Sequence, residues 1–367
     1  MNFDFSDEQR MLREQARRFL SEASTFHALR ERIANGTLLD HDLWRQVAEL
    51  GWLAVAIPEE QGGLGLGALE LCVLAEEFGR SLAPVPFHGT VFLGAELLKR
   101  SELPEATSWL ERIATGEAII AVQPTLAWES VGLHVDDGVV TGSCEPLAYA
   151  AHAHAAILPV LLAGQPALVL IDLEQHPVRH HPARSLDDVV PYAVLELENT
   201  PYLVLAEGEA ARTAMRELVD QDAILTAFEQ IGGADAACTL ARDYALERHT
   251  FGRPIGSYQA VKHKLADMAV KIELARSNAY FGAWAMHAGE VADRSLAAAA
   301  CRLSATNAFE YAARECLHLH GGIGYTWEAD CHFFYKRSRL LAVILGQPGA
   351  WVDQLLTETS LKQLQIR

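Results

Sequence analysis

Residues 244–268 of this 367-residue chain read Tyr244-Ala-Leu-Glu-Arg-His-Thr-Phe-Gly-Arg-Pro-Ile-Gly-Ser-Tyr-Gln-Ala-Val-Lys-His-Lys-Leu-Ala-Asp-Met268. The segment joins two long helical patterns, and between Arg248 and Lys264 it holds four Lys or Arg and no Asp or Glu. Such a loop suits a phosphate-bearing ligand, because an arginine can hold a pyrophosphate through two parallel hydrogen bonds. An ordinary solvated basic loop is the alternative interpretation of the same charges.

A second segment near the C-terminus is rich in glycine. It reads His318-Leu-His-Gly-Gly-Ile-Gly-Tyr-Thr-Trp-Glu-Ala-Asp330 and follows a helical pattern. Glycines after a helix let a ligand approach the backbone closely, but such a run is also typical of a helix end followed by a turn. Taken alone, the segment does not distinguish the two.

Hydrophobic periodicity divides the rest of the chain into zones. Residues 1–115 are predicted to form an N-terminal all-helical domain, because Ser6 and Gln9 have capping-box spacing and helical patterns cover about 41–50 and 67–81. Residues 116–205 change to short apolar or β-branched runs, with the hairpin signal Asp137-Gly138 between two of them. This second zone predicts a small antiparallel barrel or sandwich.

Long helical patterns return in residues 206–367 and predict a C-terminal four-helix bundle. The four patterns cover about 208–248, 257–288, 292–319 and 329–356. The predicted fold class is therefore α+β, with a helical domain, a small antiparallel β domain and a four-helix bundle.

The composition excludes some classes of partner. The chain has 48 Asp or Glu against 30 Lys or Arg, a formal net charge of −18. This excess repels phosphate backbones and anionic membrane faces, so no nucleic-acid or membrane partner is predicted. The six cysteines are scattered without a C-x-x-C pair, and the histidines lack acids or cysteines at ligand spacing. Free thiols and no metal site are therefore expected.

The N-terminal residues lack the basic and apolar regions of a secretory signal. No uncharged apolar stretch approaches the roughly 20 residues that span a bilayer. We therefore expect a soluble protein of the cytoplasm.

Together, the two C-terminal segments resemble the acyl-CoA dehydrogenase family. The pattern Tyr-Ala-x-x-Arg-x-x-Phe-Gly-x-x-Ile, then Gln-Ala, then Leu-Ala-Asp-Met is similar to the signature of that family's bundle. The Ser-Asp-Glu-Gln opening and the stretch Ile-Pro-Glu-Glu-Gln-Gly-Gly-Leu-Gly at 57–65 are similar to it as well. The resemblance covers essentially the whole chain, and it implies dimers or dimers of dimers with FAD at a subunit interface.

The resemblance also implies six FAD contacts, all in the third zone. Three of them reach an FAD bound mainly by the neighbouring subunit: Arg248, Phe251 and Gln259. Three lie at the adenosine end of FAD: Gly321, Gly322 and His318, the last in place of a glutamine that many relatives carry.

The reaction implied is α,β-dehydrogenation of an acyl-CoA thioester. A carboxylate removes the α-proton while the β-hydrogen leaves as hydride to the flavin, which an electron-transfer flavoprotein reoxidises. The base must be buried, since desolvation raises its pKa and strengthens it.

The sequence departs from the family at the position of this base. One branch carries a glutamate where this chain has Leu345, so that base is absent. The other branch places its glutamate at the position of Asp222, which is one methylene shorter. Glu229, seven residues later on the same helix face, is the second candidate, in an apolar setting where a carboxylate needs a partner. A third possibility is that neither Asp222 nor Glu229 is the base.

A second departure lies in the β zone. Flavin-binding relatives have a Thr-Glu-Pro-Gly-x-Gly-Ser-Asp element, whereas this chain reads Val122-Gln-Pro-Thr-Leu-Ala-Trp-Glu-Ser-Val-Gly-Leu-His134. By this resemblance, the chain keeps the residues that would contact the FAD of a neighbouring subunit. It lacks the β-zone element that would contact the flavin of its own FAD. This pattern is that of one subunit of a heteromeric enzyme with a paralogous partner, similar to those used on bulky CoA thioesters such as steroid side chains. A catalytically silent scaffold subunit and a homo-oligomer using Asp222 are the alternatives.

Overall fold

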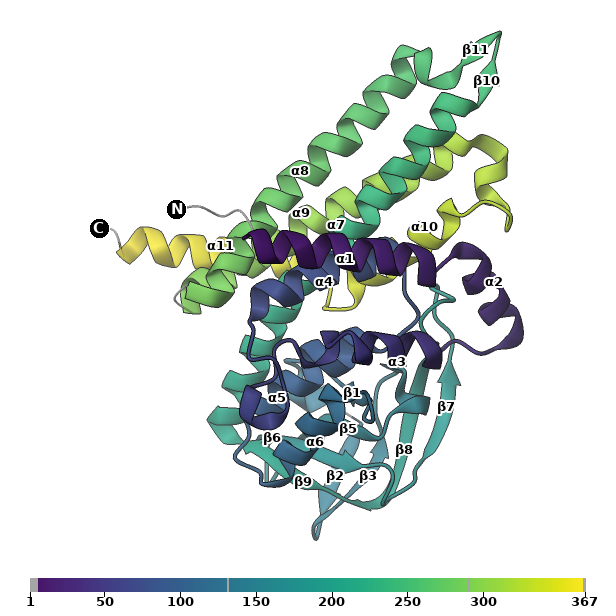
Figure 1. Cartoon of the computed structure of the whole chain (residues 1–367). Coiled ribbons are helices and arrows are strands. Elements are labelled where there is room, and N and C mark those ends of the chain that lie inside the picture. The colour runs from purple at the N-terminus through teal and green to yellow at the C-terminus, as the bar shows by residue number, and fades with distance from the viewer. Residues whose placement is uncertain (1–5, 131, 289–290, 366–367) are drawn as a thin grey trace. The chain divides into compact units, whose positions relative to one another are not determined.

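A computed structural model of the chain describes residues 6–130, 132–288 and 291–365 (Figure 1). Its internal contacts form two compact units. The bundle unit consists of Met1–Glu31, Ala68–Ala83 and Ala223–Arg367, and the β unit consists of Arg32–Gly67 and Pro84–Asp222. The units therefore differ from the three zones predicted from sequence, and the zone boundaries at 115/116 and 205/206 stay predictions.

Long helices build the bundle unit. Ser6 caps the first of them, accepting a hydrogen bond from the Gln9 backbone N–H while the Gln9 side chain accepts one from Ser6 N–H, so the predicted capping box is confirmed. The helices are α1 (Asp7–Ala23), α4 (Ala68–Ser81), the part of α7 (Gly208–Glu247) from Ala223 onward, α8 (Gln259–Ala288), α9 (Val291–His320), α10 (Cys331–Val343) and α11 (Pro348–Gln365), with the first residues of α2 (Phe26–Asn35).

Two glycines let α4 and α7 meet backbone to backbone. A Cβ on Gly232 would lie 1.8 Å from the carbonyl oxygen of Glu76, and one on Gly79 would lie 2.0 Å from that of Glu229. Any larger residue would force the helices apart. Beside this crossing, buried Glu76 pairs with Arg276 and buried Glu77 pairs with Arg17.

The last predicted helix, over about 329–356, is wrong as a single element. The chain leaves helical geometry between Val343 and Pro348, because Gly346 has φ +86° and Pro348 has no backbone N–H to continue the hydrogen-bond ladder. In the described part of 206–367 there are thus five helices rather than four. None of the described helices is long and apolar enough to cross a membrane.

The β unit holds two sheets. The first has the order β1-β5-β6-β9, built from β1 (Ile120–Val122), β5 (Ala155–Leu162), β6 (Gln165–Asp172) and β9 (Leu203–Glu207). The second has the order β2-β3-β8-β4 with β7 also paired to β8, built from β2 (Leu133–Asp136), β3 (Val139–Ser143), β4 (Leu147–Ala148), β7 (Arg179–Ala183) and β8 (Tyr192–Pro201). Buried residues of both sheets share one apolar core, so they pack as a sandwich.

Strand pairing in this sandwich is antiparallel except between β1 and β5. The predicted hairpin is confirmed, because Asp136 pairs with Val139 and the two turn residues, Asp137 and Gly138, have φ +45° and +80°. The β unit also contains α3 (His41–Glu49), α5 (Ala95–Lys99), α6 (Glu105–Ala114) and the π-helix η3 (His88–Gly94). The α+β fold predicted from sequence is confirmed.

Candidate cofactor-binding and base sites

The cation-rich segment of the sequence forms a small hairpin between α7 and α8. Strand β10 (His249–Thr250) pairs with strand β11 (Arg253–Pro254). Phe251 and Gly252 form the tip between them and have φ +53° and +77°. Figure 1 shows the hairpin projecting from the end of these two helices. The Ile255 N–H donates to the carbonyl oxygen of Arg248 over 2.8 Å and closes its base.

Side chains on the hairpin hold its shape but leave its tip uncovered. The Arg253 guanidinium lies 4.0 Å from the ring centroid of Tyr258, whose hydroxyl donates to the Thr250 carbonyl over 3.0 Å. Phe251 is 97 % exposed, and Arg248 and Gln259 are exposed as well. An aromatic ring this exposed gains about 1.5–3 kcal/mol when a partner covers it. The tip therefore has the character of a contact surface.

The glycine-rich segment begins where α9 ends, as the 3-10 turn η7 (Gly321–Tyr325). Gly321 has φ +65°, which explains a glycine there. A Cβ on Gly321 or Gly322 would meet no atom within 4 Å, so nothing in the described part of this chain requires a glycine at 322 for space. The backbone at both positions is open to an external ligand.

The two segments meet at one end of the bundle unit. The Tyr244 ring stacks on His320 with centroids 4.2 Å apart, and the Tyr244 hydroxyl donates to the His320 carbonyl over 3.4 Å. Lys264 pairs with Glu315, whose Oε2 also lies 3.5 Å from His318 Nδ1. Burial acts to raise the pKa of Glu315, but hydrogen bonds led by the one from Lys264 lower it more. All six predicted FAD-contacting residues lie in this unit.

Asp222, the first candidate base, is buried on α7 within the β unit. Its side chain is 1 % exposed, and its Oδ1 lies 2.6 Å from Nε2 of His88, the first residue of η3. The His88 ring also packs edge-on against Phe92, with centroids 5.2 Å apart. His88 could not be predicted from sequence, because 134 residues separate it from Asp222 and it belongs to no motif.

Glu229, the second candidate base, has a different kind of partner. Its Oε1 accepts a hydrogen bond from Arg337 Nη1 over 2.9 Å, and the two side chains are 12 % and 6 % exposed. Arg337 stands in the basic tract Lys336-Arg-Ser-Arg339. From sequence, such a tract is expected at a solvated or intersubunit face, with contact to CoA or FAD phosphates as the alternative. Arg337, a permanent cation, holds this carboxylate in place, which is the arrangement of a structural ion pair.

The two departures from the family pattern are visible in the structure. Leu345 lies in the break between α10 and α11, and its side chain has no carboxylate that could act as a base. Its carbonyl oxygen accepts a hydrogen bond from Trp351 Nε1 over 3.0 Å. Residues 122–134 run from β1 through a short 3-10 turn, η4 (Trp128–Ser130), to β2, and Trp128 is buried. Val131 of this stretch lies outside the described residues.

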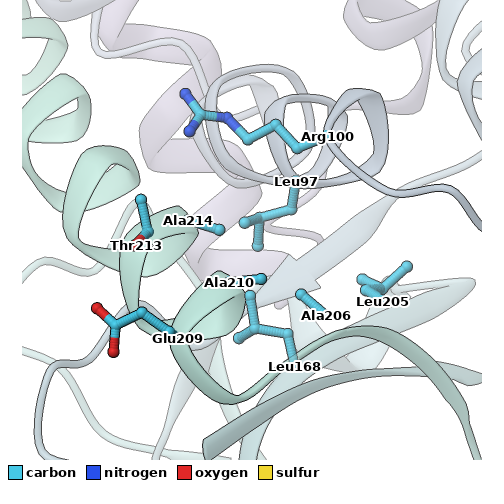
Figure 2. Close-up of a pocket in the computed structure, with 9 residues that line it drawn as sticks. All are labelled: Leu97, Arg100, Leu168, Leu205, Ala206, Glu209, Ala210, Thr213 and Ala214. Carbon is cyan, nitrogen blue, oxygen red and sulfur yellow. The ribbon is translucent and has the colours of Figure 1, made fainter.

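The β unit also contains a cavity of about 370 Å³ at the start of α7 (Figure 2). Most of its lining residues are apolar: Leu97, Leu168, Leu205, Ala206, Ala210 and Ala214. Its polar side chains are Arg100, Glu209 and Thr213. Arg100 is engaged by Glu96 and Glu217. None of the predicted site residues lines this cavity.

Comparisons with known proteins agree with the sequence resemblance. The family model for the acyl-CoA dehydrogenase N-terminal domain matches residues 6–117, and the model for the acyl-CoA dehydrogenase C-terminal domain matches residues 211–350. Acyl-CoA dehydrogenase IpdE2 of Mycobacterium tuberculosis is 33 % identical over 96 % of this chain and 97 % of its own length. Acyl-CoA dehydrogenase FadE34 of the same organism is 32 % identical over 89 % of this chain and 43 % of its own.

Solved structures show the same fold. The chain superposes on a variant of the Tcur3481-Tcur3483 steroid acyl-CoA dehydrogenase with a TM-score of 0.87 and 26 % identity, covering 98 % of this chain and 99 % of that one. It superposes on a chain of the ChsE4-ChsE5 complex of Mycobacterium tuberculosis with a TM-score of 0.88 and 24 % identity, covering 98 % and 99 %. The chain belongs to the acyl-CoA dehydrogenase family of oxidoreductases, whose cofactor is FAD.

Proposed function

We propose that this chain is one subunit of a heteromeric acyl-CoA dehydrogenase and catalyses α,β-dehydrogenation of an acyl-CoA thioester with a paralogous chain. The observation that carries the proposal is the β10–β11 hairpin. It presents Phe251 almost fully exposed at its tip and the cation of Arg248 at its base, and both belong to the family signature. A subunit that lends these groups to a neighbour would display them in this way.

The residues present fit FAD. Arg248 supplies a cation for the pyrophosphate, and Phe251 and Gln259 extend the same surface. Gly321 and Gly322 leave their backbone open for the adenosine end, with His318 beside them. Held by these residues, FAD would supply the hydride acceptor for the β-hydrogen of the thioester.

Asp222 is the proposed base for the α-proton. Its side chain is buried on α7, away from bulk water. His88 holds one carboxylate oxygen through a 2.6 Å contact and thereby orients the group. Glu229 is less suited to this role, since Arg337 already holds its carboxylate.

The named relatives support the heteromeric assembly and the substrate class. One solved relative is described as a steroid acyl-CoA dehydrogenase of two named components, and another as a complex of two chains. We therefore propose a bulky CoA thioester as substrate and an electron-transfer flavoprotein as the electron acceptor. A cytoplasmic location is part of the proposal and fits the six cysteines, none of which forms a disulfide in the described structure.

Co-expression tests the assembly. The chain purified alone should carry little flavin, and the chain co-expressed with a paralogous genomic neighbour should co-purify with it, yellow and active. The flavin absorption spectrum and the mass of each preparation measure this. A yellow, active protein without any partner would favour a homo-oligomer using Asp222, and colourless preparations with every neighbouring homologue would refute the shared site.

A further inference from the structure

Two thiols and an imidazole that the proposed function does not use come together where α9 gives way to α10. Cys316 and His320 lie one helical turn apart at the end of α9, and Cys331 is the first residue of α10. All three residues are buried, and one potential ligand atom from each lies within 4.8 Å of the others. The Cys316 Sγ to His320 Nδ1 distance is 3.8 Å.

The distance between Cys316 Sγ and His320 Nδ1 is close to that of a tetrahedral zinc site. Zinc binds thiolate sulfur at about 2.3 Å and imidazole nitrogen at about 2.0–2.1 Å. Tetrahedral angles then separate a sulfur from a nitrogen ligand by about 3.5 Å and two sulfurs by about 3.8 Å. The observed 3.8 Å therefore needs to close by only a few tenths of an ångström.

Zinc binds cysteine as the thiolate, so binding would release the thiol protons of Cys316 and Cys331. The Tyr244 ring stacked on His320 fixes the plane of the imidazole.

His320 Nδ1 lies 2.8 Å from the Cys316 carbonyl oxygen and donates to it when protonated. Metal binding through Nδ1 moves the ring proton to Nε2 and gives up that hydrogen bond. The exchange costs that one hydrogen bond and gains a metal–nitrogen bond.

We propose that Cys316, His320 and Cys331 bind one zinc ion, with a water as the fourth ligand. The site joins the end of α9 to the start of α10 across the turn Gly321–Tyr325. The inference does not rest on the proposed dehydrogenase activity, although the turn that the site spans carries the proposed FAD contacts Gly321 and Gly322. It revises the sequence-based expectation that the chain has no metal site. Two thiolates and one imidazole select zinc over hard cations such as magnesium or calcium.

The test uses the full-length chain, purified under reducing conditions, incubated with zinc chloride and desalted. Elemental analysis should find about one zinc per chain. Cys316→Ser, Cys331→Ser and His320→Gln should each lose it, and Cys238→Ser, at a partly buried thiol on α7, should retain it. Zinc content that is absent from the wild-type chain, or equal in all variants, would overturn the site.

A second measurement needs no substitution and so cannot be confounded by misfolding. Zinc should raise the melting temperature of the wild-type chain, and a chelator should reverse the rise. A chain isolated without reductant that carries a Cys316–Cys331 disulfide, seen by peptide mass mapping, and that takes up no zinc after reduction would contradict the proposal.

Discussion

The candidate functional groups at the end of the bundle unit are exposed, whereas the candidate carboxylates of α7 are buried. Phe251, Arg248 and Gln259 lie exposed. Asp222 and Glu229 are largely buried, and each is held by a specific partner, His88 or Arg337. The difference indicates which groups serve a partner and which serve the chain itself. Changes at the exposed end should alter assembly and cofactor binding, whereas changes on α7 should alter the chain's own chemistry or stability.

The largest expected effect is on turnover. Asp222→Asn in the active assembly keeps the shape of the side chain but removes its basicity, so turnover should fall by about 10²–10⁴-fold while flavin is retained. Steady-state kinetics and the flavin spectrum measure the two quantities. Glu229→Gln is the matched control on the same helix and should keep most of the turnover. Full activity in Asp222→Asn would exclude Asp222 as the base.

The next effect is on stability. Arg337→Ala removes the ion pair with the buried Glu229 carboxylate and should lower the free energy of unfolding by about 3–5 kcal/mol, measured by urea denaturation. Arg339→Ala, two residues away, removes an exposed ion pair with Glu310 and should lower it by about 0–1 kcal/mol. Equal decreases of the free energy of unfolding in the two variants would contradict the burial of the Glu229–Arg337 pair.

A smaller effect depends on pH at Glu315, which links the two segments of the bundle end. Its folded pKa is lowered from the ordinary 4.5, so its stabilisation is complete above that value and is lost as the pH falls through the lowered folded pKa. Glu315→Gln should therefore be less stable than the wild type at neutral pH, and the difference should vanish in acid. Thermal unfolding across pH measures it, with Glu310→Gln on the same helix as the control. A difference that persists at low pH would contradict this assignment.

Local sequence signals predicted most of the helices and strands, because periodicity and turn chemistry act over a few residues. The Asp137-Gly138 hairpin is one example. The break before α11 was not predicted, since apolar spacing continues through the positive φ of Gly346 and through Pro348, which together interrupt the helix.

The partners of the candidate bases could not be predicted from sequence. His88 reaches Asp222 across 134 residues, and Arg337 reaches Glu229 across 108. Arg337 is buried, but it stands in a run of cations whose charge alone predicts an exposed position. Likewise, Cys316 and His320 have helical spacing, but only the turn at Gly321–Tyr325 returns Cys331 to them.

The flavin-to-protein ratio of the mixed assembly with Arg248→Ala in this chain shows directly whether the two chains share an FAD site. Arg18→Ala, an exposed arginine on α1, is the matched control. If this chain lends Arg248 to an FAD held mainly by its paralogue, the Arg248→Ala assembly should stay intact but lose most of its flavin, and the control should keep it. An intact assembly with unchanged flavin would contradict the shared site and identify this chain as a scaffold.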